Sequence, residues 1–541
     1  MPPRRDAPLP LWMIFPVVFT ALYASHATLM RLPYYWDEAG YYIPAAWDFF
    51  RTGSLIPTTT LTNAHPPLPS IYLALWWKLS GYLPEVTRVS VLLVAALGLL
   101  AVGRLAMRLT NPSNSLASPT SSGSVAIAFW TVVLTGLYPV WFAQSTMAHA
   151  DIFAAACTLW GLVYALPDRN RKPWAAALWF AAAVLSKETA IAIPLVLAGI
   201  ALGAGLRMPK SGARRRLFKE AAWLAGCVLP LIGWYAWHYA KTGFLFGNPE
   251  YLRYNAQANL DPIRIMAAFG HRLLHLTAHM NLFVPVGMAL AALLLNPHTD
   301  ADGNERPGLS PAVTRRILLL LLVNALFFSV LGGALLTRYL LPMYPLVILL
   351  AVSTLQRRAP AWQALTAFSA VAFVLGLFIN PPYGFAPEDN LAYSHVVRLH
   401  EAGIAQLNKL YPGSTVLSAW PVTDELSKPE LGYLKKPYDV VPLEDFSAAQ
   451  ISRAAEEPEK YSVALVFSTK EEPSSPFFTL GAKSKEMDER YFGLHQDLQP
   501  EAIAQQLGGT LVWKQSDQGQ WIALIRFNRA IEARIEGGEV N

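Results

Sequence analysis

The chain has 541 residues, of which 53% are hydrophobic and 15% are charged, and its mean hydropathy is +0.30. Soluble domains carry about 25% charged residues, so this composition excludes an ordinary soluble protein. The net charge of +6 is uneven, because residues 1–380 hold 28 basic and 14 acidic side chains whereas residues 381–541 hold 15 and 23. The basic residues form short clusters between apolar runs, which is typical of membrane topology and not of nucleic-acid binding.

Apolar runs predict about eleven transmembrane helices. A helix needs about 20 apolar residues to cross the hydrocarbon core, and such runs lie at 11–30, 86–108, 123–143, 148–166, 173–187, 189–206, 221–240, 280–296, 316–336, 339–355 and 361–379. We therefore predict a polytopic α-helical membrane protein with additional interfacial helices. Its transmembrane domain spans residues 1–380, and a small C-terminal α/β domain follows at residues 381–541.

The basic clusters predict the orientation of these helices, because cytoplasmic loops carry an excess of Lys and Arg. Arg4 and Arg5 favour a cytoplasmic N-terminus. Alternation from there puts the basic clusters at 104–108, 169–172, 207–219, 315–316 and 357–358 on the same side. We expect a protein integral to the cytoplasmic membrane, with the loops 31–85, 144–151 and 241–279 and the C-terminal domain outside the cytoplasm.

The tail after residue 380 becomes acidic and polar. Strands are predicted at 415–420, 461–468, 510–514 and 521–527, helices at 447–457 and 500–507, and a hairpin turn at 516–519. No P-loop, GxGxxG or metal-ligand spacing occurs in it. We interpret the tail as a recognition or packing domain, with catalysis elsewhere.

Ionisable residues at the ends of membrane spans are functional candidates. Asp37 and Glu38 lie among aromatic residues in the first outer loop, where a short interfacial helix is expected. The alternative is that both acids cap that helix. His65 precedes two prolines that fix an extended entry into the next helix. Its ring can contact a phosphate or a metal there, or form a structural hydrogen bond.

Three more polar positions fall on the same outer face. Asp151 opens the fourth span, as an active-site acid or as a helix N-cap. Lys187 and Glu188 interrupt an apolar hairpin, either as an ion pair with each other or as contacts to a lipid phosphate. Arg338 begins the tenth span, where it snorkels to the surface or holds a phosphate bidentately. The convergence of these residues on one face predicts a site.

This order of motifs resembles the GT-C glycosyltransferases, in their protein O-mannosyltransferase-like and aminoarabinose-transferase-like branch. The resemblance covers residues 10–380 and is carried by DE at 37–38, HPPL at 65–68, the acid at 151, SKE at 186–188 and RYLLPMYP at 338–345. It implies a polyprenyl-phosphate-linked sugar as donor and an extracytoplasmic acceptor, which is a lipid, a glycan or a protein.

The resemblance also assigns roles to residues. It implies Asp37 as the catalytic carboxylate, Glu38 as its support and Asp151 as the second acid of the site. His65 stands where relatives carry a basic residue. Ala64 stands where some relatives carry a metal-binding acid, which argues against metal binding of that type. A divalent metal ion stays open as a cofactor, and no other cofactor is implied.

The chemistry of glycosyl transfer agrees with these residue types. A base must accept the proton of the acceptor hydroxyl group, and positive groups must stabilise the departing phosphate. Asp37 supplies the first, and the predicted substrate-binding residues His65, Lys187, Glu188, Arg338 and Tyr339 include the second. We predict transfer with inversion, with membrane lipids as partners. A transporter or lipid flippase, which keeps polar groups near the midplane, and a non-catalytic envelope partner are the alternatives.

Overall fold

The computed structural model describes residues 11–62, 64–110, 122–167, 171–245, 260–299, 305–331, 334–469, 482–492 and 497–527. The chain forms two compact units. The membrane unit combines Met1–Met30 with Ala45–Ile379, and the C-terminal unit combines Arg31–Pro44 with Asn380–Asn541. The segment that carries the acidic pair at 37–38 therefore belongs to the C-terminal unit.

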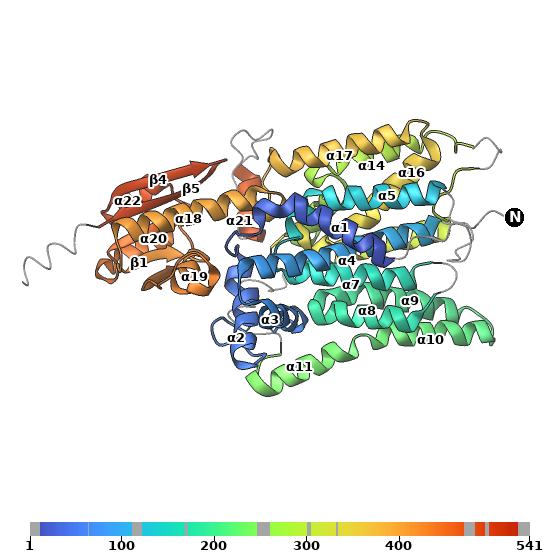
Figure 1. The fold of residues 1–541 in the computed structure, drawn as a ribbon, viewed down its shortest axis with the longest axis horizontal. Helices are drawn as coiled ribbons and strands as arrows, with labels where there is room; N and C mark the ends of the chain where they lie inside the picture. Colours follow the sequence, from blue (N-terminus) through green and yellow to red (C-terminus); the bar gives the residue numbers. More distant parts are fainter. Residues whose placement is uncertain are drawn as a thin grey trace, which may run out of the picture. The chain divides into compact units, whose positions relative to one another are not determined.

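The membrane unit is built of helices (Figure 1). They are α1 (Leu11–His26), η1 (Ala27–Leu29), α2 (Ile43–Thr52), α3 (Leu68–Ser80), α4 (Pro84–Thr110), α5 (Ser122–Leu137), α6 (Pro139–Gln144), α7 (Ala150–Ala165), α8 (Pro173–Ser186), η3 (Glu188–Ile191), α9 (Ala192–Leu206), α10 (Gly212–Gly226), α11 (Leu229–Thr242), α13 (Pro262–Thr277), η4 (His279–Asn281), α14 (Phe283–Ala292), α15 (Pro311–Val330), η5 (Thr337–Leu340), α16 (Tyr344–Arg358) and α17 (Trp362–Phe378). Five of them, α4, α6, α8, α13 and α15, start on a proline, whose missing N–H costs nothing at the first helical position.

Several helices can cross a membrane by length and composition. Within the described ranges four segments qualify alone, namely Pro84–Thr110, Glu188–Leu206, Gly212–Thr242 and Pro311–Val330. The pair Pro262–Asn281 and Phe283–Ala292 qualifies jointly but bends by 99°. Shorter apolar helices lie at Met13–Leu29, Ser122–Leu137, Ala150–Ala165, Pro173–Ser186 and Trp362–Phe378. The chain is an integral membrane protein, while the number of about eleven spans and their orientation stay predictions.

Helix α7 lies inside the membrane unit, with α4 and α8 packed along it (Figure 1). It is apolar on nearly all sides and most of its residues are buried, as expected of a helix surrounded by other helices. Gly161 permits the close approach of α8, because a Cβ atom there would lie 2.5 Å from the ring of Phe180. This packing fixes the start of α7, where Asp151 lies.

The C-terminal unit is a five-stranded sheet with helices on both faces. Its strands are β1 (Val416–Ala419), β2 (Val440–Leu443), β3 (Val463–Phe467), β4 (Thr510–Asp517) and β5 (Gln520–Arg526). Their order is β2-β1-β3-β5-β4, with β1 parallel to β2 and β3, and β5 antiparallel to β3 and β4. The helical elements are η2 (Glu38–Tyr42), η6 (Pro387–Asp389), α18 (Ala392–Leu410), α19 (Val422–Ser427), η7 (Pro429–Leu431), α20 (Ala448–Ala455), η8 (Pro458–Lys460), α21 (Ala482–Phe492) and α22 (Pro500–Leu507).

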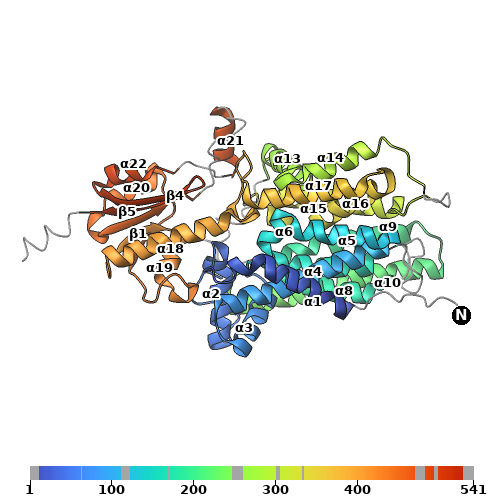
Figure 2. The same ribbon diagram turned by 45° about the horizontal axis from the view of Figure 1, so that its top comes forward.

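Two side chains of β5, three positions apart, show that both faces of the sheet are covered. Ile522 meets Gly403 of α18, whereas Ile525 meets Gly509, which follows α22. Because side chains alternate between the faces of a sheet, α18 and α22 lie on opposite faces (Figure 2). The buried strands β1, β3 and β5 are accordingly apolar without alternation.

The predicted small α/β domain is confirmed, with differences in its elements. The four predicted strands correspond to β1, β3, β4 and β5, the two predicted helices to α20 and α22, and the predicted hairpin joins β4 to β5. Strand β2 and helix α18 were not predicted from the sequence. Strand β2 has only four residues and contains Pro442, so its pattern is too short to stand out. Of the predicted outer loop 241–279, residues 246–259 lie outside the described residues.

Candidate active site

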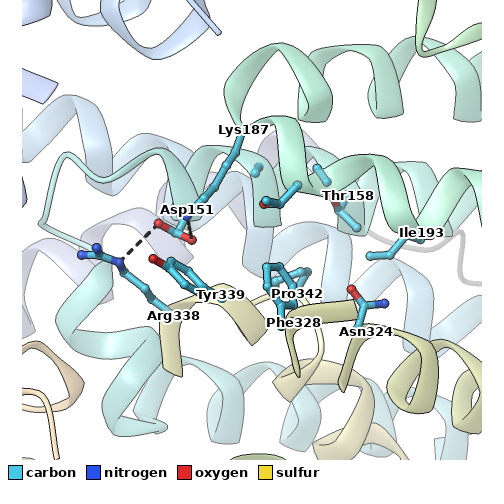
Figure 3. A pocket seen from close by; sticks show the side chains of 12 residues that line it. Asp151, Thr158, Lys187, Ile193, Asn324, Phe328, Arg338, Tyr339 and Pro342 are labelled. Carbon is cyan, nitrogen blue, oxygen red and sulfur yellow. Dashed lines mark hydrogen bonds and ion pairs between the residues drawn. The ribbon is translucent and has the colours of Figure 1, made fainter. Parts of the chain in front are cut away.

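Three charged side chains from distant parts of the chain meet at one end of α7. The side chain of Asp151, in the first turn of α7, is 3% exposed, and its Oδ1 accepts a hydrogen bond from Lys187 Nζ at 2.6 Å. Its Oδ2 lies 3.5 Å from Arg338 Nε, which is an ion pair without a strong hydrogen bond. Figure 3 shows both contacts. Lys187 ends α8 in an extended conformation and Arg338 lies in η5, so three separate elements build this cluster.

These contacts decide between the sequence-based alternatives. Asp151 is not the N-cap of α7, because that position is His149. Arg338 is 2% exposed and does not snorkel to a surface. Lys187 and Glu188 do not pair with each other, since Lys187 binds Asp151 while Glu188 Oε2 lies 3.1 Å from His65 Nδ1. Lys187 is extended at the end of α8 whereas Glu188 is the first residue of η3, so the two side chains meet different partners.

Tyr339 is surrounded by cationic side chains. Lys187 Nζ lies 4.2 Å from the centre of its ring, Arg272 Cζ 5.7 Å and Arg338 Cζ 6.0 Å. A cation over an aromatic face is attracted by the ring quadrupole. Tyr339 thus holds three positive side chains near one another, as the predicted substrate-binding role of this residue requires.

Arg272 is a member of the cluster that the sequence did not single out. It lies in α13 and is 1% exposed, and its Nη1 donates to the Leu336 carbonyl oxygen at 2.7 Å. Among the described residues its Nε has no hydrogen-bond partner. The signal available in the sequence was an arginine in an amphipathic helix of a membrane protein. An ionisable side chain is costly where it is buried in the membrane.

His149 connects the cluster to the turn before α7. Its Nδ1 lies 2.9 Å from Gln144 Oε1, and Arg338 Nη1 lies 3.1 Å from Nδ1 and 3.3 Å from Nε2. Arginine can only donate, so the ring accepts from Arg338 through one nitrogen while the other donates to Gln144. The neutral histidine orients the guanidinium group towards Asp151. His149 therefore has a structural role beside the cluster.

His65 and Glu188 form a second polar pair in the membrane unit. The chain reaches His65 through Ala64, whose φ of +54° lies in the left-handed region and whose carbonyl oxygen accepts from Trp234 Nε1 at 2.9 Å. This anchor and the prolines that follow hold the histidine next to η3. Lys187 binds Asp151 and the next residue, Glu188, binds His65, so these two consecutive residues connect the two pairs.

A small pocket adjoins the Asp151 cluster (Figure 3). Its polar end is formed by Asp151, Lys187, Arg338 and Tyr339. The other walls are formed by residues of α7, η3, α9 and α15 and by the proline between η5 and α16, namely Ala154, Thr158, Thr189, Ala190, Ile193, Asn324, Phe328 and Pro342. The walls thus change from charged to mainly apolar away from Asp151. An amphipathic molecule with an anionic head matches this gradient.

Three cationic side chains are buried around Tyr339. They are Lys187, Arg272 and Arg338, and ion pairs join Asp151 to Lys187 and to Arg338. Taking an ion out of water costs several kcal/mol unless it is paired and hydrogen-bonded. All three cations would attract an anion bound among them, so the cluster suits an anionic ligand.

The acidic pair lies in the C-terminal unit. Asp37 is the N-cap residue of η2, a π-helix, and its side chain makes no capping hydrogen bond. Asp37 thus occupies the cap position that the sequence offered as an alternative, without a capping hydrogen bond from its side chain. Glu38 is fully buried, and its Oε2 accepts from the Tyr35 N–H at 3.0 Å, which closes the turn before η2. Asp37 is partly exposed, as a carboxylate that must reach a substrate has to be.

Within the described residues no group of three or more His, Cys, Asp or Glu side chains is arranged to hold a metal ion. His271, His275 and His279 follow one another along α13 and η4, with neighbouring ring centres 6.5 and 5.3 Å apart. The divalent metal named with the resemblance stays a prediction.

The fold was compared with known proteins. The structure of ArnT from Cupriavidus metallidurans in the apo state matches with a TM-score of 0.54 at 14% identity, over 95% of this chain and 98% of that chain. ArnT bound to undecaprenyl phosphate matches over the same shares, with a TM-score of 0.53 and 14% identity. The chain has the GT-C fold. The fold expected from the sequence motifs is thereby confirmed over nearly the whole chain.

The other comparisons do not strengthen the evidence for the fold. The arabinofuranosyltransferase AftD from Mycobacteria matches with a TM-score of 0.38 at 14% identity, over 97% of this chain and 40% of that chain, and we draw nothing from it. No protein-family model matches the chain, and no curated protein matches it in sequence. The likeness to ArnT therefore speaks for the GT-C fold, and the chemistry has to be argued from the residues.

Proposed function

We propose that this chain is a membrane glycosyltransferase that moves a sugar from a polyprenyl-phosphate donor to a hydroxyl group of an extracytoplasmic acceptor. The three buried cations around Tyr339, next to a pocket with mainly apolar walls, carry the proposal. A polyprenyl phosphate is an anion attached to an apolar chain, which is the chemistry this pocket matches. The complex of the similar ArnT with undecaprenyl phosphate supports the same ligand class.

The proposed reaction is a single displacement at the anomeric carbon. The acceptor oxygen forms a bond to that carbon while the bond from the carbon to the phosphate oxygen breaks, and the phosphate leaves with the electron pair. Asp37 accepts the hydroxyl proton as general base. Lys187, Arg272 and Arg338 stabilise the charge that develops on the phosphate. Attack opposite the leaving group inverts the anomeric configuration.

The remaining predicted residues have supporting roles in this proposal. Glu38 holds the turn that carries Asp37, and Asp151 orients Lys187 and Arg338. His65, paired with Glu188, is a further contact for the donor headgroup. The proposed orientation has the N-terminus in the cytoplasm, and a reporter fused to each terminus tests it.

The decisive experiment is mass spectrometry of the lipids that co-purify with the protein, combined with turnover of polyprenyl-phosphate sugars. The wild type is expected to carry the lipid and to transfer the sugar with inversion. Arg272→Gln is expected to lose the lipid by about tenfold or more, since a hydrogen bond from a charged donor contributes about 1.5–3 kcal/mol. Arg315→Gln, a change at an exposed arginine of α15, is the matched control and should retain it.

Replacement of the proposed base, Asp37, should affect lipid binding and turnover differently in the same experiment. Asp37→Asn is expected to retain the lipid and to lose turnover. Absence of polyprenyl lipids together with no turnover of such donors contradicts the proposal. Translocation of the lipid without covalent transfer would instead identify the protein as a flippase. A product with retained configuration would disprove the single displacement.

A further inference from the structure

The segment 31–44 packs against the C-terminal domain although the sequence places it 350 residues earlier. The Tyr34 N–H donates to the Leu431 carbonyl oxygen at 3.4 Å, and Tyr433 Oη donates to the Tyr34 carbonyl oxygen at 3.0 Å. The side chain of Tyr34 is fully buried. Tyr35 follows with its ring centre 5.8 Å from that of Tyr393 in α18. The approach to the acidic pair is thus fixed by backbone hydrogen bonds and buried rings.

Trp420 contacts the segment on both sides of the acidic pair. Its ring stands edge-on to that of Trp36, with the centres 5.3 Å apart, and lies 5.8 Å from that of Tyr41. Between them, a Cβ atom on Gly40 would lie 2.5 Å from Trp420 Cζ2 and 2.7 Å from its Nε1. Only glycine allows η2 to approach the indole this closely.

The position of Trp420 in the sheet indicates a role for its contact with the segment 31–44. It follows β1 directly, at the carboxyl end of a strand that is parallel to both of its neighbours. In open α/β sheets, ligands bind beyond the carboxyl ends of the strands. Here a segment of the same chain lies at the end of β1. The domain uses the position at which other α/β domains hold a ligand to hold Trp36, Gly40 and Tyr41.

The held conformation is one that the segment does not favour by itself. Trp36 has a φ of +46°, in the left-handed region that is strained for a non-glycine residue. Glu38–Tyr42 form a π-helix, which is rare and often found at functional sites. Packing against the C-terminal domain must compensate for the strained φ of Trp36 and for the π-helix. Trp420 is itself anchored, by a side-chain hydrogen bond to Asp424, which pairs with Lys428 at 2.9 Å.

We propose that the C-terminal domain positions the acidic pair, with Trp420 and Tyr433 as positioning residues that act through Trp36, Gly40 and Tyr34 to fix the direction of Asp37. This inference rests on the proposed function for the role of Asp37, but the structural hold is testable without it. The domain interpreted from sequence as a recognition or packing module thereby contributes to catalysis without touching the reacting atoms.

The test is a cycle of variants in the full chain. Gly40→Ala introduces the methyl group that meets the indole, Trp420→Ala removes the indole, and the double variant has neither the glycine nor the clash. Gly199→Ala is the matched control, because a Cβ atom on this helical glycine meets nothing within 4 Å. Hydrogen exchange of residues 31–44 and kcat and KM for the donor are measured for each protein.

The expected result is a strong interaction within the cycle. Gly40→Ala and Trp420→Ala each increase exchange in the segment and lower kcat by about 100-fold, as misplacing a catalytic group by about 1 Å can do, with donor KM changed less than twofold. The double variant is no worse than Trp420→Ala. Gly199→Ala matches the wild type. Tyr433→Phe, which removes one hydroxyl group and no packing, lowers kcat more mildly and is the variant least able to disturb folding.

Each other outcome overturns a defined part of the inference. Unchanged exchange in residues 31–44 of Gly40→Ala and Trp420→Ala refutes the hold itself. Increased exchange with wild-type kcat refutes the positioning role. Effects on kcat that multiply in the double variant refute the contact between Gly40 and Trp420. A wild type without transferase activity refutes the proposed function, and the exchange data then still decide whether the domain holds the segment.

Discussion

Lys187→Met tests the buried ion pair on which the candidate site depends. The change keeps the length of the side chain and removes its charge, so Asp151 loses the donor at 2.6 Å and keeps only Arg338 at 3.5 Å. At an effective dielectric constant of about 20, two charges at this separation attract by roughly 6 kcal/mol. Desolvation offsets part of this, and removing one partner of a buried pair costs about 3–5 kcal/mol in measured cases. We expect a loss of unfolding free energy in that range.

The assay is a double-mutant cycle with Lys187→Met, Asp151→Leu and both together, followed by thermal unfolding in detergent. Each single variant leaves an uncompensated buried charge, whereas the double variant leaves none from this pair. The double variant should therefore be more stable than the sum of the two single losses predicts. A coupling energy below about 1 kcal/mol, the range of exposed ion pairs, would refute the conclusion that this pair is buried and strong.

Three more outcomes are expected. Arg272→Lys keeps the charge but should still bind the donor lipid several-fold more weakly than the wild type, because an ammonium group lacks the planar fork of arginine; equal affinity would contradict a specific guanidinium contact. Gly161→Ala should destabilise the membrane unit by about 1–3 kcal/mol, since the new methyl group meets Phe180 at 2.5 Å. Gly203→Ala, in open space, should be nearly neutral in the same unfolding experiment. The pKa of Asp424 is raised by burial, which the Lys428 ion pair and the Trp420 hydrogen bond partly oppose. Its contribution to stability is therefore full below the unfolded value of about 3.9 and is lost as the pH rises through the raised value. Asp424→Asn should abolish this loss, and parallel stability curves for the two proteins would contradict it.

Much of the architecture was predictable because it depends on composition and periodicity. The apolar runs predicted membrane helices, and the change of composition near residue 380 predicted a separate α/β domain. Four of the five strands were predicted from their apolar, β-branched sequences. These features are local, since a run of apolar residues must be buried or lie in lipid whatever surrounds it.

The members of the candidate site were partly predictable for the same reason. Asp151, Lys187 and Arg338 were visible as charges at the ends of apolar runs, and the structure brings all three together. Arg272 was hidden because one arginine in an amphipathic helix is ordinary until its neighbours are known. Only the tertiary structure decided that Lys187 pairs with Asp151 and not with Glu188, since partners depend on which helix ends meet.

The sequence by itself determined a membrane protein with a C-terminal α/β domain, motifs that resemble the GT-C enzymes, and charged residues at the ends of its apolar runs. The tertiary structure decided which charges pair, that three cations gather around Tyr339, and that residues 31–44 fold with the C-terminal domain. Such facts depend on contacts between residues far apart in the chain. The contact between Gly40 and Trp420 joins positions 380 residues apart, and no pattern along a single segment encodes it.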